Sequence, residues 1–258
     1  RSWRIEWPLH PGEPAVARYL RPAETQGQAF APLMVWLQPD GSAVLGQQLW
    51  GRELLTWLYD LHYSLLCDLP GRQVVGVLGV LWCLSWLSGV LLWWPRPGQW
   101  RAAWRFKRQA SGPRLAYDLH KLTGLTMAGV ALVLGLSGAV LTWHQPLERA
   151  LATWWPMFQP PALAASAASG ASVGAPAPLL PLQALVARAQ GQWPQAEPRW
   201  LEVSPAGWVR VQLWQAGEPS RRFPRTQVWL DARSGAVLAQ RDGLHDHAAD
   251  ASLAWMHP

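Results

Sequence analysis

Charged residues and cysteines are both scarce in this sequence. Only 15% of the 258 residues are charged, whereas 50% are hydrophobic, which is expected when lipid replaces part of the aqueous solvent. A disulfide between the two cysteines, Cys67 and Cys83, is not expected, because Cys83 lies well inside an apolar run; both are interpreted as packing residues. The chain has no glycine-rich dinucleotide fingerprint and no convincing Ser/His/Asp or paired-carboxylate arrangement. We therefore expect neither a bound dinucleotide nor hydrolysis.

Two long runs without charge, residues 74–94 and 122–143, organise the chain. Each can cross ~30 Å of hydrocarbon as a helix rising ~1.5 Å per residue. Between them, residues 95–114 hold six basic residues and no acid, and short basic loops of this kind stay in the cytoplasm. The runs predict a membrane hairpin whose far ends emerge outside the cytoplasm. This topology explains much of the net charge of +6, so no nucleic-acid partner is expected.

The N-terminal part is predicted to be an extramembrane region. Residues 32–38 and 43–49 predict a β-hairpin around an Asp-Gly turn. Residues 52–66 have a helical apolar period, and we expect a break at 68–71 before the first span. Because this region has to lie outside the cytoplasm and no signal peptide precedes it, we expect the sequence to be part of a longer chain with a further span.

The C-terminal part predicts a small α+β domain. Residues 182–192 suit a helix, and four later segments, 199–203, 208–214, 226–230 and 236–241, suit antiparallel strands. The organisation that we expect is a periplasmic region at 1–58, a periplasmic-side helix and span at 59–95, a cytoplasmic basic loop at 96–117, a span at 118–144, a connector with an Ala/Ser/Pro-rich linker at 145–181, the α+β domain at 182–245 and an approach to a further span at 246–258.

Part of the hairpin is repeated. Tyr-Asp-Leu-His occurs at 59–62 and again at 117–120, and Ser-Gly followed by an apolar run and Trp occurs at 88–93 and 137–143. Repeated membrane helices often build sites around a pseudo-symmetry axis. Glycines along both runs let either helix backbones or a macrocycle approach closely, and both interpretations remain open.

These motifs resemble those of the PepSY-associated transmembrane proteins, a family that includes ferric-siderophore reductases of the bacterial inner membrane. The resemblance covers most of the chain. It implies a membrane α-helical fold, a four-helix bundle in the full protein with two spans visible here, and periplasmic α+β PepSY-like domains. The motifs that carry the resemblance are Leu-His at 61–62, Leu-Pro-Gly-Arg at 69–72, the segment 88–96, Leu-His-Lys-Leu-Thr-Gly-Leu at 119–125 and the hairpin at 228–238.

In the reductases, the resemblance implies b-type haem held by histidines near helix ends. Imidazole is a good axial ligand for haem iron, and a histidine beside a membrane span is usually functional. The candidates for binding haem are His62, His120, His144 and His257. His120 and His144 are about 24 residues apart, or ~36 Å along a helix, so they cannot share one haem. If both are ligands, there must be two haems, one toward each face of the membrane, and two haems are what we expect.

Each histidine also has an ordinary structural interpretation. His120, at the cytoplasmic end of the second span, could be an interfacial side chain, and His62 could be a packing residue on an apolar helix face. His144 is the candidate partner of His62, but a histidine at a helix end near an interface is common, and His257 is a rival partner. His245 and His247 are best explained as a solvated loop.

The expected activity is that of a di-haem oxidoreductase. Electrons from a cytoplasmic or membrane donor would pass from a haem held by His120 to an outer haem involving His62, and on to ferric iron in a periplasmic siderophore. Lipid and the ferric siderophore are the expected partners. Two alternatives remain: a haem-free PepSY protein that binds a partner or regulates a peptidase, and a siderophore-uptake subunit without redox activity.

Overall fold

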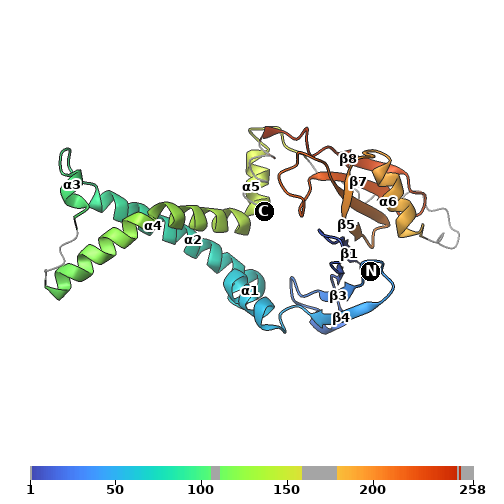
Figure 1. The fold of residues 1–258 in the computed structure, drawn as a ribbon, viewed down its shortest axis with the longest axis horizontal. Coiled ribbons are helices and arrows are strands. Elements are labelled where there is room, and N and C mark those ends of the chain that lie inside the picture. The colour runs from blue at the N-terminus through green and yellow to red at the C-terminus, as the bar shows by residue number, and fades with distance from the viewer. Residues whose placement is uncertain (1, 106–110, 159–178, 249, 251–258) are drawn as a thin grey trace. The chain divides into compact units, whose positions relative to one another are not determined.

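The computed structural model describes residues 2–105, 111–158, 179–248 and 250. The chain forms two compact units, a helical one of Leu61–Arg149 and a second one of Arg1–Asp60 together with Ala150–Pro258, which is built on a sheet (Figure 1). Residues 159–178 of the expected connector at 145–181, and residues 106–110 of the basic loop, fall outside the described residues.

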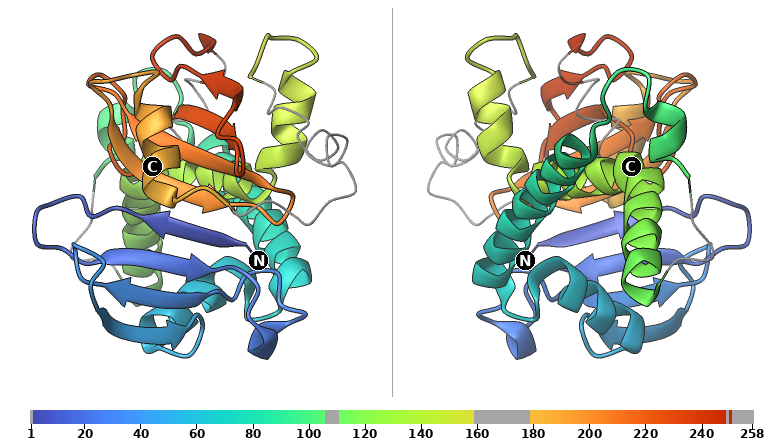
Figure 2. Two further views of the ribbon diagram at one scale, coloured as in Figure 1. Left: turned by 90° about the vertical axis from the view of Figure 1, so that its right-hand side faces the viewer. Right: turned by 90° about the vertical axis from the view of Figure 1, so that its left-hand side faces the viewer.

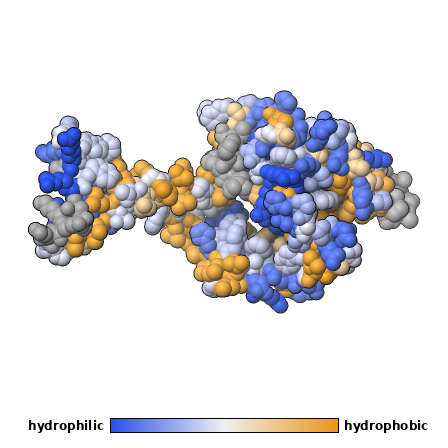
Figure 3. Space-filling model, viewed as in Figure 1, coloured by the Kyte–Doolittle hydropathy of each residue, from blue (hydrophilic) through white to orange (hydrophobic). Residues whose placement is uncertain are grey.

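Two long helices, α2 (Asp68–Trp93) and α4 (Gly112–Thr142), form the helical unit and confirm the two predicted spans. Few of their side chains are buried within the protein, and apolar residues cover much of their visible surface (Figure 3). Such a surface is stable in lipid and unfavourable in water. A short helix, α3 (Trp100–Ala103), lies in the connection between them. The four-helix bundle stays a prediction.

The break before the first span begins at Leu65, earlier than expected, and overlaps the predicted residues 68–71 only at Asp68, whose φ is 53°. The helix α1 (Leu54–Ser64) ends first, and Leu65 and Leu66 then take positive φ angles of 53° and 58°. Pro70 falls in the first turn of α2, where a backbone N–H would have no helical acceptor in any case. Proline is therefore compatible with the first turn of this helix and does not interrupt it.

Glycines bring α2 and α4 close together. A Cβ built on Gly79 would lie 3.3 Å from the carbonyl oxygen of Gly135, and one on Gly76 would lie 2.6 Å from the side chain of Thr142. By contrast, a Cβ on Gly129 or Gly138 would have nothing within 4 Å. Some glycines of the spans are thus required for helix packing, as small residues often are in membranes, and others are not.

The second unit contains one antiparallel sheet of eight strands in the order β4-β3-β2-β1-β5-β6-β7-β8 (Figures 1 and 2). The predicted hairpin in the N-terminal part and the four C-terminal strands are confirmed, whereas β1 and β2 were not predicted. The strands are β1 (Trp3–Glu6), β2 (Ala15–Tyr19), β3 (Leu33–Leu37), β4 (Val44–Leu49), β5 (Glu197–Val203), β6 (Trp208–Trp214), β7 (Thr226–Asp231) and β8 (Val237–Arg241).

Pairing of β1 with β5 joins the N-terminal and C-terminal regions into this single sheet. Ile5 lies opposite Leu201 in the antiparallel register. Beside them, the Arg4 guanidinium donates a hydrogen bond of 3.3 Å to the Glu202 carboxylate. The two regions that the sequence predicts separately are therefore continuous through backbone hydrogen bonds.

The core of this unit lies between the sheet and the helix α6 (Leu182–Gln190), which packs on β5, β6 and β7. Leu185 from the helix and Leu201 from β5 are fully buried. Alternate residues of β6 are buried, as expected for a strand with one face on a core. The core contains eleven buried residues: Leu185, Val186, Ala189, Ala196, Leu201, Val209, Val211, Leu213, Val228, Leu230 and Ala232.

Candidate functional site

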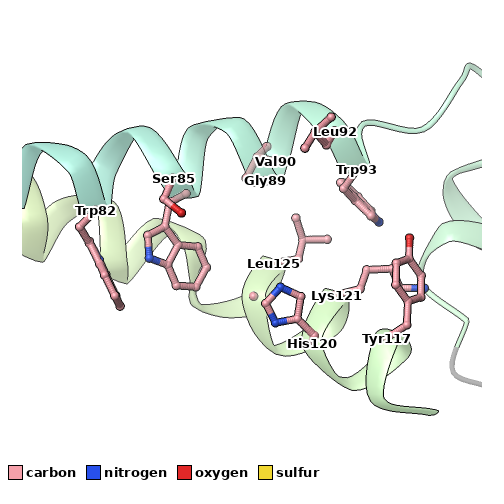
Figure 4. Close-up of a pocket in the computed structure, with 12 residues that line it drawn as sticks. Trp82, Ser85, Gly89, Val90, Leu92, Trp93, Tyr117, His120, Lys121 and Leu125 are labelled. Carbon is pink, nitrogen blue, oxygen red and sulfur yellow. The ribbon is translucent and has the colours of Figure 1, made fainter. Parts of the chain in front are cut away.

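A cavity of about 480 Å³ lies between α2 and α4, and His120 is among its lining residues. Its walls are mostly apolar and aromatic, and side chains from both helices point into the same space (Figure 4). The lining comprises Trp82, Ser85, Trp86, Gly89, Val90, Leu92 and Trp93 from α2, and Tyr117, His120, Lys121, Gly124 and Leu125 from α4.

The helical spacing of α2 places its tryptophans along the cavity. Trp82 and Trp86 are four residues apart and therefore share a face, and their ring centroids are 5.9 Å apart. Trp93 lies nearer the end of the helix, where Trp100 and Trp104 contact its ring edge-on with centroids 5.7 Å away. These contacts hold the Trp93 indole in place. Its Nε1 is buried and has no hydrogen-bond partner among the described residues.

His120 belongs to the second copy of the Tyr-Asp-Leu-His motif, which lies on α4. Its neighbour Asp118 is fully buried, 3.2 Å from the Lys121 ammonium and 3.4 Å from the Arg114 guanidinium. Pairing with two cations makes burial of the carboxylate tolerable. The imidazole itself is exposed toward the cavity, which leaves it accessible to a ligand.

The first copy of the motif is used differently. Asp60 accepts a hydrogen bond of 2.9 Å from the Trp50 indole nitrogen, and Tyr59 packs edge-on against the same indole. His62 follows in the last turn of α1 and is exposed. The two copies therefore share a sequence but hold their aspartates with different partners.

The other end of the hairpin holds His144. It is the first residue of α5 (His144–Leu151) and lies 3.4 Å from the Glu148 carboxylate. Nearby, the Trp143 indole donates a hydrogen bond of 2.7 Å to Gln73, and Arg72 donates one of 3.0 Å to the Leu141 carbonyl. These bonds tie the end of α4 to the start of α2, so His144 is placed at a well-connected end of the helix pair.

Among the three described candidates for binding haem, His62, His120 and His144, His120 alone lines the cavity. The helix α4 runs without interruption from before His120 almost to His144. The continuous helix supports the inference that these two histidines cannot share one haem. The pairing of His62 with His144 stays a prediction, and His257 lies outside the described residues.

The remaining histidine pair lies in a loop of the sheet unit. His245 Nδ1 is 2.8 Å from the Asp242 carboxylate, and its side chain is 82% exposed. Burial raises the pKa of Asp242, but hydrogen bonds from His245, the Leu244 N–H and Gln215 outweigh it, so the pKa lies below its ordinary value of 3.8. Among the described residues, no group of three or more His, Cys, Asp or Glu side chains is arranged to hold a metal ion.

The sequence predicted His120 but not the cavity. Of the cavity tryptophans, only Trp93 was interpreted from the sequence, as a residue at the membrane interface, and the face that it shares with Trp82 and Trp86 was not recognised. The signal was present: positions 82, 86, 89 and 93 recur at intervals of three or four, which places them on one side of a helix. Only the packing of α4 against that side shows that they enclose space.

The fold and the site define a membrane protein with two apolar spanning helices and an extramembrane antiparallel sheet. The sequence pattern of the PepSY-associated TM region matches residues 3–258, and the chain belongs to this family. It is also 41% identical over 87 residues to uncharacterized protein PA4219 of Pseudomonas aeruginosa, a match that covers 33% of this chain and 21% of that protein. The predicted family is thereby confirmed.

Proposed function

We propose that this protein is a haem-containing reductase of the bacterial inner membrane that reduces siderophore-bound ferric iron in the periplasm. The observation that carries the proposal is the cavity between α2 and α4, where one imidazole projects from an otherwise largely apolar wall. Imidazole is a usual axial ligand of haem iron. Histidine beside a membrane span is costly unless it has a function or a partner.

The cavity suits a large ligand in size, and its lining offers flat apolar surface. Its volume of about 480 Å³ lies within the range of ~300–1,000 Å³ typical of ligand pockets. A Cβ built on Gly89 would meet nothing within 4 Å, and one on Gly124 would only touch the Trp86 ring at 3.8 Å. Both glycines therefore keep space free in the cavity wall. The tryptophan rings supply flat apolar surface for a macrocycle.

A b-type haem supplies a one-electron iron couple when it is bound at such a site. His120 would hold the iron through a ring nitrogen. The apolar side chain of Leu125, with the indoles of Trp82 and Trp86, would exclude water and lower the local dielectric, which tunes a reduction potential.

The outer histidines complete the proposed arrangement. We assign His62, with His144 or His257 as its partner, to a second haem on the periplasmic side. An electron taken from a cytoplasmic or membrane donor would convert the substrate's iron from ferric to ferrous. Ferrous iron is held less tightly by the hard oxygen ligands of a siderophore, and its release is the proposed product step.

The decisive experiment is an absorption spectrum of the detergent-purified protein, oxidised and then reduced with dithionite, with a pyridine haemochrome assay for stoichiometry. We expect two b-type haems per chain in the wild-type protein. Each of the variants His120→Ala and His62→Ala should retain only one. His10→Ala is the matched control, because His10 is exposed in the sheet unit, and it should retain both haems. Full haem content in both of the first two variants would contradict the proposal.

Two further outcomes separate the reductase from its rivals. Haem-loaded protein should reduce a ferric siderophore, and the ferrous product can be followed with a coloured ferrous chelator. Absence of haem after expression with sufficient iron and haem would instead favour a partner-binding or peptidase-regulating protein. Haem without ferric reduction would contradict the proposed substrate.

A further inference from the structure

One hydrogen-bond donor at the cavity is buried without an acceptor. The Nε1–H of Trp93 has no partner among the described residues, although Trp93 lines the cavity. A buried polar group that lacks a hydrogen bond is costly, so such groups usually have a partner when the protein carries its ligand. A tryptophan at a membrane interface normally bonds water or lipid headgroups, but this nitrogen is shielded from solvent.

The Trp93 ring is also held by its neighbours. Trp100 and Trp104 pack edge-on against it, each with a centroid distance of 5.7 Å. An indole that is fixed by two aromatic contacts cannot rotate freely to find an acceptor elsewhere. The donor therefore keeps a set position beside the cavity.

A cation on the opposite helix lies at the same cavity. Lys121 is among the lining residues, its side chain is 10% exposed, and its ammonium lies 3.2 Å from Asp118 and 5.8 Å from the centroid of the Tyr117 ring. Asp118 is shared with Arg114, so this group of three side chains carries one positive charge in excess. One further anion at the cavity would balance it.

We propose that Trp93 and Lys121 receive a carboxylate of the bound ligand and so fix how the ligand is oriented. The proposal rests on the proposed haem site at His120, where the ligand's carboxylates are its propionates. The indole N–H would donate to a propionate oxygen, and the ammonium would pair with the same group. Trp93 is then a positioning residue: it sets the orientation of the macrocycle about the iron, whereas His120 binds the iron.

The test compares two forms of the ligand, haem b and its dimethyl ester, which lacks the carboxylates but keeps the macrocycle. Each is titrated into haem-depleted full-length protein, and binding is measured as the part of the Soret absorption that His120→Ala abolishes. We expect wild-type protein to prefer haem b over the ester. Trp93→Phe removes the N–H and keeps an aromatic ring, and it should reduce this preference about tenfold, or about 1.4 kcal/mol, with little change in affinity for the ester.

The matched control is Trp86→Phe, which changes a second indole of the same cavity that is not an orphaned donor. It should leave the preference for haem b unchanged. Lys121→Gln is the second test variant and should reduce the preference as Trp93→Phe does. If Trp93→Phe binds neither form of the ligand, Lys121→Gln alone tests the carboxylate assignment.

The outcomes distinguish this inference from the proposed function. If Trp93→Phe keeps the preference for haem b over the ester, the carboxylate assignment is overturned while haem binding at His120 stands. If Trp93→Phe binds neither form, an unchanged preference in Lys121→Gln has the same consequence. Failure of the wild-type protein to bind either form overturns both. A loss of preference in Trp86→Phe equal to that in Trp93→Phe would show a general packing effect and would also overturn the assignment.

Discussion

Replacing Gly135 with alanine should separate the two spanning helices. A Cβ at this position would lie 2.7 Å from the Cys83 sulfur, 3.1 Å from the Trp82 ring and 3.4 Å from the carbonyl oxygen of Gly79. Comfortable contacts of this kind need ~3.5–4.0 Å, so α2 has to move by ~1 Å or the side chains have to leave their rotamers. Inserting a methyl group into such a contact typically costs about 1–3 kcal/mol.

The matched control is Gly129→Ala on the same helix, where a Cβ would meet nothing within 4 Å. Both substitutions gain the higher helix propensity of alanine, about 1 kcal/mol in water, so this term cancels in the comparison. We therefore expect Gly135→Ala to be less stable than Gly129→Ala by about 1–3 kcal/mol.

The assay is reversible unfolding in mixed detergent, followed by circular dichroism, with the free energy of unfolding compared between the two variants. Because Trp82 both contacts position 135 and lines the cavity, Gly135→Ala should also reduce the haem content that depends on His120. Equal stability of Gly135→Ala and Gly129→Ala would refute the close packing of α2 and α4 on which the cavity depends.

Three further predictions concern single side chains. Backbone N–H groups of the turn after β7 donate to the Asp231 carboxylate and hold its pKa below the ordinary 3.8. The stability that the ionised carboxylate confers is therefore complete above pH ~4 and is lost as the pH falls through the pKa of the folded state. Leu201→Ala, at the centre of the joined sheet, should cost about 2–5 kcal/mol, against little for the exposed Leu45→Ala. Asp118→Ala leaves the nearly buried Lys121 unpaired and should cost about 3–5 kcal/mol.

Each of these three predictions can be checked by unfolding experiments. Asp231→Asn should unfold with a weaker dependence on pH than wild type between pH 5 and 3, and parallel curves would contradict the pKa assignment. Denaturation of Leu201→Ala should disrupt the whole sheet in one transition, and separate melting of β1–β4 would contradict the continuity of the sheet through β1 and β5. Adding Lys121→Met to Asp118→Ala should restore part of the lost stability, because the unpaired cation is then removed.

Short-range elements were largely predictable. The hairpin of β3 and β4 follows from its Asp-Gly turn, where Gly41 takes a φ of 74° and the Asp40 carboxylate accepts a bond from the Ser42 N–H. The strands β6 and β7 agree with the predicted segments to within a residue. In each case neighbours in sequence supply the hydrogen bonds, so the pattern of residue types is enough.

Long-range pairings were not predictable in the same way. β1 is only four residues long and of mixed character, and nothing in Trp3–Glu6 indicates that its partner is β5, at the other end of the chain. A short strand with charged side chains becomes stable only when a neighbouring strand supplies both backbone bonds and a partner such as Glu202 for Arg4. The joining of the two regions is thus a property of the tertiary fold.

The candidate site is divided in the same way between sequence and structure. By itself the sequence determined the two spans, because uncharged runs of this length can satisfy their backbone only as helices in lipid. It also determined that a histidine stands near an end of each. Only the tertiary structure decided that Trp93 and His120 border one cavity, because that depends on the rotation and close approach of two helices, which the glycines of their interface permit.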